Sequence, residues 1–258
     1  MDNDVLIPYI TQNANRAAES NIPCAVSKFL DAVQLSQARA LSKKLSGRFV
    51  FWGGYEGAER VVMLFVPDYV PEGIETAEIF SQFSDSCPLS AVRIKKDRFS
   101  SVTHRDYLGA VMGLGISRET VGDITVREDG CDIIALTQTA KYIAMNLTSA
   151  GRASLSTELA DISQVKAPDI KFEEISFTVA SPRTDAVTGE IFSLPRSAAQ
   201  RAVETGLVFL NDEQITKSDR HVAPGDKLVL RGRGRAVLGD SFITTKKGRL
   251  RISARKSV

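Results

Sequence analysis

The sequence predicts an α+β protein with three domains, spanning residues 1–75, 76–170 and 171–258. Three observations support this fold class. A stretch with helical periodicity precedes two β-rich runs in the first domain, which indicates an α/β domain. Strand-like and helix-like segments follow the order βαββαβ in the second. In the third, a short helix is followed by short strands separated by turn residues. A chain of 258 residues is long enough for two or three domains.

The first domain is expected to begin with a helix from about Ser27 to Leu45 that ends at Gly47. Two strands, Phe49–Trp52 and Arg60–Pro67, follow as a hairpin around a glycine-rich turn. The turn reads Gly-Gly-Tyr-Glu-Gly; it lacks the Gly-Lys-Ser/Thr ending and the following helix that a phosphate-binding loop needs. We therefore interpret it as a connection, with Tyr55 as a packing residue. Residues 68–87 are rich in Pro, Gly, Ser and acids, which favours a linker or a loose edge.

The central domain shows a ferredoxin-like pattern, as in RNA-recognition motifs. The expected strands are 89–94, 122–128, 131–136 and 153–159, and the expected helices are 104–114 and 137–150. The strands carry Val, Ile and Cys where an RNA-recognition motif needs aromatic residues for base stacking. Any RNA contact of this domain should therefore use charge and backbone shape.

The run from His104 to Ile124 is the most distinctive part of the central domain. His-Arg-Asp resembles a kinase catalytic loop, but the other kinase motifs are missing from the sequence. Three glycines suit a tight helix–loop–strand connection, with Arg118 and Glu119 in an exposed loop. The run is expected to present His104, Arg105 and Arg118 as candidate RNA contacts.

The last domain is predicted from residues 183–235. A short amphipathic helix opens at Leu194–Arg201, with Ser193 or Ser197 as a capping hydroxyl, and ends at Gly206. Strand 207–210 leads to an Asn-Asp turn at 211–212, a second strand begins at Ile215, and a Pro-Gly-Asp turn precedes strand 227–230.

Charge is distributed unevenly along the chain. Residues 179–258 hold 15 Lys and Arg against 8 Asp and Glu, whereas residues 1–178 hold 18 against 23. A cationic end on a mildly acidic body favours a polyanionic partner, bound with an affinity that falls as salt rises. A solvated basic tail is the alternative.

Other features exclude several classes of protein. No apolar run is long enough to span a bilayer, and the acidic N-terminus is unlike a signal peptide, so we expect a cytoplasmic protein without a membrane partner. The three cysteines are widely spaced and lack nearby histidines, which argues against disulfides and zinc. No cofactor or metal is expected.

The C-terminal pattern strongly resembles the S4 domain of ribosomal proteins, tRNA synthetases and pseudouridine synthases. The resemblance rests on Arg183-Thr184-Asp185, on Leu194–Arg201, and on the Asn-Asp and Pro-Gly-Asp turns. Thr184 replaces an apolar residue of that family, and Asp212 replaces a glycine. The resemblance implies an S4 RNA-binding domain with a basic C-terminal extension.

Three longer runs resemble the YlmH family of bacterial S4-domain proteins. They are FWGGYEGAERVV, HRDYLGAVMGLGISRETVGDI, and RGRGR followed by TKKGRLRI. This resemblance implies association with large ribosomal subunits that hold peptidyl-tRNA, contacts with ribosomal RNA and tRNA, and a part in the rescue of stalled translation. DNA is not expected as a partner. Arg233 stands where the family more often has an aromatic residue.

We therefore expect a non-enzymatic RNA-binding protein whose cations contact phosphates, with residues 231–235 as a flexible basic strand. The candidate RNA-binding residues are Arg183, Arg196, Ser197, Gln200, Arg201, Lys217, Arg231, Arg233, Arg235, Lys246, Lys247 and Arg249.

Two alternatives stay open. An RNA-modifying enzyme similar to pseudouridine synthases, or its delivery subunit, would need a catalytic aspartate in an Arg-Leu-Asp context or a cofactor loop, and residues 1–178 show neither. Asp106, Asp123 and His104 would then be the best catalytic candidates. A protein scaffold would keep its partners after nuclease treatment.

Overall fold

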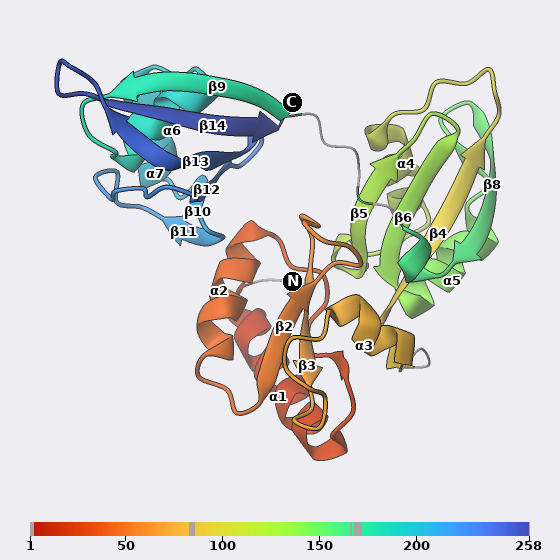
Figure 1. Ribbon diagram of the computed structural model, residues 1–258. Helices are drawn as coiled ribbons and strands as arrows, with labels where there is room; N and C mark the ends of the chain where they lie inside the picture. The colour runs from red at the N-terminus through yellow and green to blue at the C-terminus, as the bar shows by residue number, and fades with distance from the viewer. Residues whose placement is uncertain (1–2, 83–85, 166, 168–171, 258) are drawn as a thin grey trace. The chain divides into compact units, whose positions relative to one another are not determined.

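The computed structural model describes residues 3–82, 86–165, 167 and 172–257. It divides the chain into two compact units, unit 1 (residues 1–168) and unit 2 (residues 169–258). Each unit combines helices with antiparallel sheets, which confirms the α+β class (Figure 1).

Unit 1 begins with two helices and a three-stranded sheet of order β1-β3-β2. Its elements are α1 (Asn3–Ser20), β1 (Cys24–Ala25), α2 (Ala32–Ser42), β2 (Arg48–Trp52) and β3 (Val62–Val66). The hairpin of β2 and β3 is confirmed, with Trp52 paired to Val62. The sequence-based expectation lacked α1, although Leu6, Ile10, Ala14 and Ala17 recur at helical spacing and are buried in one cluster with β3.

The helix expected from Ser27 to Leu45 is shorter than predicted. Asp31 caps α2, because its Oδ1 accepts hydrogen bonds of 2.9 Å from the backbone N–H groups of both Val33 and Gln34. Residues 26–30 before the cap are not helical, and Leu30 forms a β-bridge with Val61 in which the Leu30 N–H donates to the Val61 carbonyl at 2.8 Å. The apolar residues of this segment therefore lie first beside β3 and then in a helix. The spacing of apolar residues alone did not reveal this change of structure.

The second sheet of unit 1 has five strands in the order β5-β6-β4-β8-β7. Helices α4 and α5 pack on one face and bury a cluster that includes Tyr107, Val111 and Ile143. The predicted βαββαβ order is present, with one additional short strand, β7, where the second helix was expected to continue. The elements are β4 (Leu89–Lys96), α4 (His104–Gly113), β5 (Val121–Val126), β6 (Gly130–Leu136), α5 (Thr137–Asn146), β7 (Ser149–Ala150) and β8 (Ala153–Ala160).

The other face of the five-stranded sheet packs against the N-terminal hairpin. Trp52, Val62 and Leu64 share one buried cluster with Ala91 and Ile134. The segment expected as a linker, 68–87, instead contains α3 (Thr76–Gln82), whose Phe80 stacks on Trp52 with ring centroids 5.5 Å apart. Unit 1 therefore has a continuous core across residue 75, and the boundary between the first two expected domains stays a prediction.

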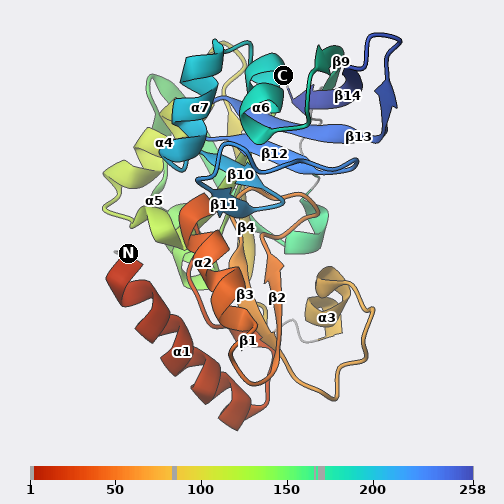
Figure 2. The ribbon, with the colours of Figure 1, turned by 90° about the vertical axis from the view of Figure 1, so that its left-hand side faces the viewer.

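Unit 2 is a six-stranded antiparallel sheet of order β11-β10-β12-β13-β14-β9 with two helices on one face (Figure 2). Its elements are β9 (Phe172–Val179), α6 (Thr184–Phe192), α7 (Arg196–Glu204), β10 (Val208–Leu210), β11 (Glu213–Ile215), β12 (Lys227–Leu230), β13 (Gly234–Thr244) and β14 (Leu250–Ser257).

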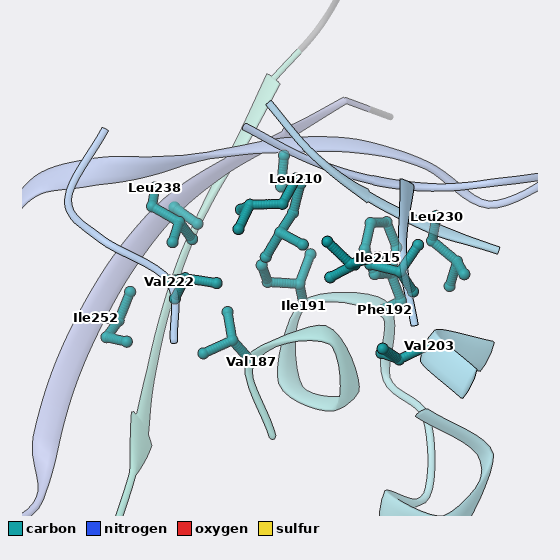
Figure 3. Packing of buried hydrophobic residues seen from close by; sticks show 14 of the residues in the cluster. Val187, Ile191, Phe192, Val203, Leu210, Ile215, Val222, Leu230, Leu238 and Ile252 are labelled. Carbon is teal, nitrogen blue, oxygen red and sulfur yellow. The ribbon is translucent and has the colours of Figure 1, made fainter. Parts of the chain in front are cut away.

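The core of unit 2 lies between α6 and the sheet. Figure 3 shows Val187, Ile191 and Phe192 pointing from α6 toward side chains of the strands such as Leu210 and Leu238. All are at most 3% exposed. This packing fixes the exposed faces of the helices, because the apolar stripe of each helix must face the sheet.

Some predictions for unit 2 are confirmed and others are corrected. Asn211 and Asp212 form a tight turn with φ of 51° and 65°, which suits the twist of a two-residue hairpin. Ile215 ends β11 rather than beginning it. The basic end of the chain is not a tail: β13 and β14 pair with each other, and β14 pairs with β9.

Candidate nucleic-acid interface

The start of α6 is organised by an ion pair with a buried carboxylate. Asp185 is fully buried, and its two oxygens accept hydrogen bonds of 3.0 and 2.9 Å from Nε and Nη2 of Arg183. The Ala186 N–H donates to the same carboxylate at 2.8 Å. Burial alone would raise the pKa of Asp185, but these hydrogen bonds outweigh it and the pKa is lowered. Arg183 therefore supports the fold, and its half-exposed guanidinium stays close to solvent.

The loop 216–221 is held against the same helix end. The Thr184 N–H donates to the Arg220 carbonyl at 2.8 Å, and the Asp185 N–H donates to the Ser218 carbonyl at 3.2 Å. Lys217 is exposed on this loop. Arg196 lies near enough for its charge to help lower the pKa of Asp185. Three predicted residues, Arg183, Arg196 and Lys217, thus gather around the start of α6.

Helix α7 exposes the residues predicted for it. Ala199, Ala202 and Val203 are buried, whereas Arg196, Ser197, Gln200 and Arg201 are exposed. Gln200 donates to Glu204 Oε1 at 2.7 Å, so its amide is partly occupied. Pro195 stands at the cap position without a side-chain hydrogen bond, and Ser193 ends α6 with φ of 53°. The predicted capping role of Ser193 or Ser197 is therefore wrong.

The turn at 231–233 lies beside the end of α7. The Arg231 N–H donates to the Leu207 carbonyl at 2.9 Å, and the Arg233 N–H donates to the Leu230 carbonyl at the same distance. Both side chains are exposed, while Arg235 is half-buried within β13. The expected flexible basic strand is instead a hydrogen-bonded turn and the start of a strand.

Three further candidates lie elsewhere on unit 2. Lys246 and Lys247 are exposed in the turn between β13 and β14. Arg249 is exposed too, and its guanidinium donates to the Thr178 carbonyl at 2.8 Å. This turn and α7 lie at different ends of the unit (Figure 2). The candidates thus form two surfaces: the α7 surface, with its neighbouring loops and turn, and the hairpin tip at 246–249.

The three candidates in unit 1 are in different environments. His104 and Arg105 are exposed in the first turn of α4. Arg118, expected in an exposed loop, is half-buried, and its Nη1 donates to the carbonyls of Val121 and Gly122. Glu119 is half-buried as well and forms an ion pair with Lys28. The expectation of an exposed loop at 118–119 is corrected.

Asp106 serves a structural purpose. Its Oδ2 accepts hydrogen bonds from the Thr103 N–H at 2.8 Å and from the Thr103 hydroxyl at 2.7 Å, which completes a capping box for α4. The hydroxyl hydrogen bond, and then the backbone one, lower the pKa of Asp106. A carboxylate used in this way is a poor general acid.

Asp123 joins the two most distinctive motifs of unit 1. Its carboxylate accepts hydrogen bonds from the Tyr55 hydroxyl at 2.7 Å and from the N–H groups of Glu59 and Arg60 at 2.8 and 3.1 Å. Burial, and then the charge of Asp123, raise the pKa of Tyr55 far above its usual range. Tyr55 is therefore a packing and hydrogen-bonding residue, as predicted, and Asp123 holds the glycine-rich turn.

We expect Asp123→Ala to destabilise unit 1 by about 2 kcal/mol, because it leaves donors of the 55–60 turn without an acceptor. Trp52 is the only tryptophan of the chain and lies in unit 1, so its fluorescence during urea unfolding reports on this unit alone. Tyr55→Phe removes one of the three hydrogen bonds and should cost less. An unfolding midpoint equal to that of the wild type would show that Asp123 does not secure this turn.

The described residues contain no cluster of three or more His, Cys, Asp or Glu side chains that could hold a metal ion. Burial raises the pKa of Cys131 to about 12, so this thiol is a poor ligand at neutral pH. Within the same residues, no helix is both long and apolar enough to cross a membrane.

The candidate RNA-binding residues did not include several exposed cations. Arg220 shares the loop of Lys217 and pairs with Glu213 at 2.9 Å. Arg251 and Arg255 are exposed along β14, at alternate positions with the exposed Ser253 between them. The alternation of these positions with buried Ile252 and Ala254 is a strand signal, which a basic-tail interpretation hides.

Comparisons with known proteins agree with the resemblance found in the sequence. A family model described as "Putative RNA-binding domain in YlmH" matches residues 88–164. The chain is 33% identical over 240 residues to "Ribosome-associated protein quality control protein P2" of Bacillus subtilis, covering 92% of this chain and 89% of that protein. A solved structure, "Cell division protein ylmH from Streptococcus pneumoniae", covers 63% of this chain and 93% of its own, with 22% identity and a TM-score of 0.49. Since the identity to the Bacillus protein extends over nearly the whole length of both chains, the chain belongs to the YlmH family.

Proposed function

We propose that this protein is a non-enzymatic RNA-binding factor that docks on the large ribosomal subunit and takes part in the rescue of stalled translation. Its ligands would be ribosomal RNA and the tRNA that the subunit still holds, and it would act in the cytoplasm. The name of the Bacillus relative supports the ribosome-associated role, and the matched family model supports RNA binding.

The α7 surface is the observation that carries the proposal. Arg196 and Lys217 lie around the start of α6, which the Arg183–Asp185 ion pair orders, and Arg201 is exposed on the same helix as Arg196; internal hydrogen bonds hold these elements in place. Arginine guanidinium groups suit phosphate because they donate two hydrogen bonds in one plane. A fixed frame keeps these donors in position, so little ordering is needed on binding.

We further propose three functional domains at the predicted boundaries. Residues 1–75 would form the N-terminal α/β domain and residues 76–170 a domain like the RNA-recognition motif. Residues 171–258 would form an S4 domain with a basic C-terminal extension. In this arrangement the S4 domain anchors the protein on RNA, and unit 1 contributes to the choice of ribosomal state.

The test is crosslinking of the tagged protein in cells, followed by sequencing of the attached RNA. We expect enrichment of large-subunit RNA and tRNA over messenger RNA. Attachment to messenger RNA alone would contradict the proposal. Partner proteins that stay bound after nuclease treatment would favour a protein scaffold instead.

An RNA-modifying enzyme is the second candidate function. Asp106 and Asp123, the acids best placed in the sequence for catalysis, are both occupied by hydrogen bonds that hold the fold. This observation favours the non-enzymatic role. Mass spectrometry of bulk RNA from cells with and without the protein would show a lost modified nucleoside if the enzymatic alternative held.

A further inference from the structure

Phe99 is an aromatic ring that the fold of unit 1 does not use. Phe99 is 99% exposed and lies in the loop between β4 and α4, at one end of the five-stranded sheet (Figure 1). Burial of a phenylalanine side chain is worth about 1.5–3 kcal/mol, and the fold forgoes that stabilisation here. The position therefore suggests a contact with another molecule.

The loop that carries Phe99 is ordered by its own hydrogen bonds. Asp97 Oδ1 accepts from the N–H groups of Phe99 and Ser100 at 3.1 and 2.9 Å, and Asp97 Oδ2 accepts from the Ser100 hydroxyl at 2.7 Å. The Asp97 N–H donates to the Ser154 carbonyl at 3.3 Å. The ring is thus presented on a built turn that is fixed to the neighbouring strand β8.

Cationic residues are frequent in the chain segments that meet at this turn. The Lys96 N–H donates to the Asp129 carbonyl, and Lys96 pairs with Leu155 across the sheet, so segments 95–99, 127–129 and 151–152 meet at one end of the sheet. Together they hold five Lys and Arg against three Asp and Glu. Asp97 is engaged as described, and Asp129 pairs with Arg127 at 3.3 Å. Lys95, Arg98 and Arg152 are exposed on these segments.

The face of the five-stranded sheet that lies opposite α4 and α5 cannot supply a ring for base stacking. Part of it is buried against the N-terminal hairpin through Ala91 and Ile134. Farther along the same face, Asp132 is 4% exposed and forms ion pairs with Arg93 and Arg127. An RNA base that stacks on an aromatic ring of unit 1 would therefore need a ring outside this face of the five-stranded sheet. Phe99 is such a ring.

We propose that Phe99, Lys95, Arg98 and Arg152 form a binding site for an unpaired nucleotide of RNA. The base stacks on the Phe99 ring, and the cations bind the phosphates on either side of it. This inference rests on the proposed function, from which it takes RNA as the ligand. It adds a contact in unit 1, whereas the α7 surface belongs to unit 2.

A tryptophan at the site makes stacking directly visible. In Phe99→Trp the new indole is exposed, whereas the native Trp52 is 8% exposed and stacked on Phe80. We expect 12-nucleotide oligouridine to quench the emission of the full-length variant saturably and to leave wild-type emission unchanged. A 12-base-pair RNA duplex should quench it far less, because its bases are already stacked.

Affinity is measured by anisotropy of labelled oligouridine, in full-length protein carrying Arg196→Glu and Arg201→Glu so that the α7 surface does not dominate. We expect Phe99→Ala to weaken binding about 10-fold, within the range typical for loss of one stacked base. Phe99→Tyr should bind as tightly as the Phe99 parent. Met145→Ala, which removes another exposed apolar side chain (79% exposed, on α5), should have no effect.

The site is refuted if the emission of the Phe99→Trp variant is unchanged when anisotropy shows saturation, or if Phe99→Ala binds like its parent. Full binding by Phe99→Leu would also overturn it, because an aliphatic contact then suffices and a protein partner becomes the better explanation. Failure of the proposed function would look different: the wild type would not cosediment with large subunits, while the quenching at position 99 persisted.

Discussion

Charge reversal at Arg196 and Arg201 is expected to weaken binding to large ribosomal subunits about 100-fold or more. Each hydrogen bond to a charged group contributes about 1.5–3 kcal/mol, and a carboxylate in its place repels the phosphate. Both side chains are exposed, and the buried face of α7 is untouched, so the melting temperature should change little. Cosedimentation of the double variant with purified subunits, over a range of salt concentrations, measures the effect.

Two comparisons make this result specific. Lys43→Glu with Lys44→Glu changes the net charge equally at surface positions of unit 1 and should leave cosedimentation intact. Lys246→Glu with Lys247→Glu tests the hairpin tip, which lies apart from α7 (Figure 2). If the Lys43 and Lys44 pair weakened binding as much as the α7 pair did, net charge rather than the α7 surface would explain it.

Replacing Asp185 by Asn should destabilise unit 2 by roughly 2–3 kcal/mol, which corresponds to about 10 °C in melting temperature for a unit of this size. The reason is that the carboxylate is fully buried and accepts hydrogen bonds from Arg183 and from the Ala186 N–H. Hydrogen exchange of peptides from α6 and β12 measures this loss, with peptides from β6 of unit 1 as the internal control.

The Asp185→Asn substitution should also make the free energy of unfolding of unit 2 fall less steeply as the pH is lowered into the acid range. The folded-state pKa of Asp185 is lowered, so the unfolded chain binds more protons at this group than the folded one. Its contribution is complete above the unfolded pKa, about 3.9, and is lost as pH falls through the folded pKa.

Calorimetry of the wild type and of Asp185→Asn from pH 7 to pH 3 should therefore show a difference that narrows below about pH 4. Asp219→Asn, at an exposed position of the nearby loop, should behave like the wild type. A difference that stays constant to pH 3 would mean that the Asp185 pKa is not lowered by folding.

Local patterns in the sequence predicted much of the fold. The hairpin of residues 48–66, the order of the central elements and the turn at Asn211–Asp212 all depend on neighbouring residues, and all are present. The strand β14 was missed because it is defined by pairing with residues that are distant in the sequence. β14 pairs with β9, which lies far earlier in the chain, and without β9 its arginines look like a tail.

The candidate interface was predictable in part for the same reason. The exposed face of α7 follows from helical spacing, so Arg196 and Arg201 were placed correctly on the surface. Arg118 was misjudged although its carbonyl partners, Val121 and Gly122, are only three and four residues farther along the chain, because a side-chain hydrogen bond to the backbone leaves no periodic signal in the sequence. Phe99 carries no local signal of exposure, since an isolated phenylalanine is usually a core residue.

The cluster that joins Trp52, Val62 and Leu64 to Ile134 and Ile162 has a consequence during synthesis. The hairpin leaves the ribosome first, and Ile162 follows about 100 residues later, a delay of roughly 5–20 s at common elongation rates. Throughout that time the apolar side of the hairpin lacks part of its partner. We therefore expect a nascent chain halted in this interval to expose a hydrophobic surface of the kind that makes incomplete chains prone to aggregate.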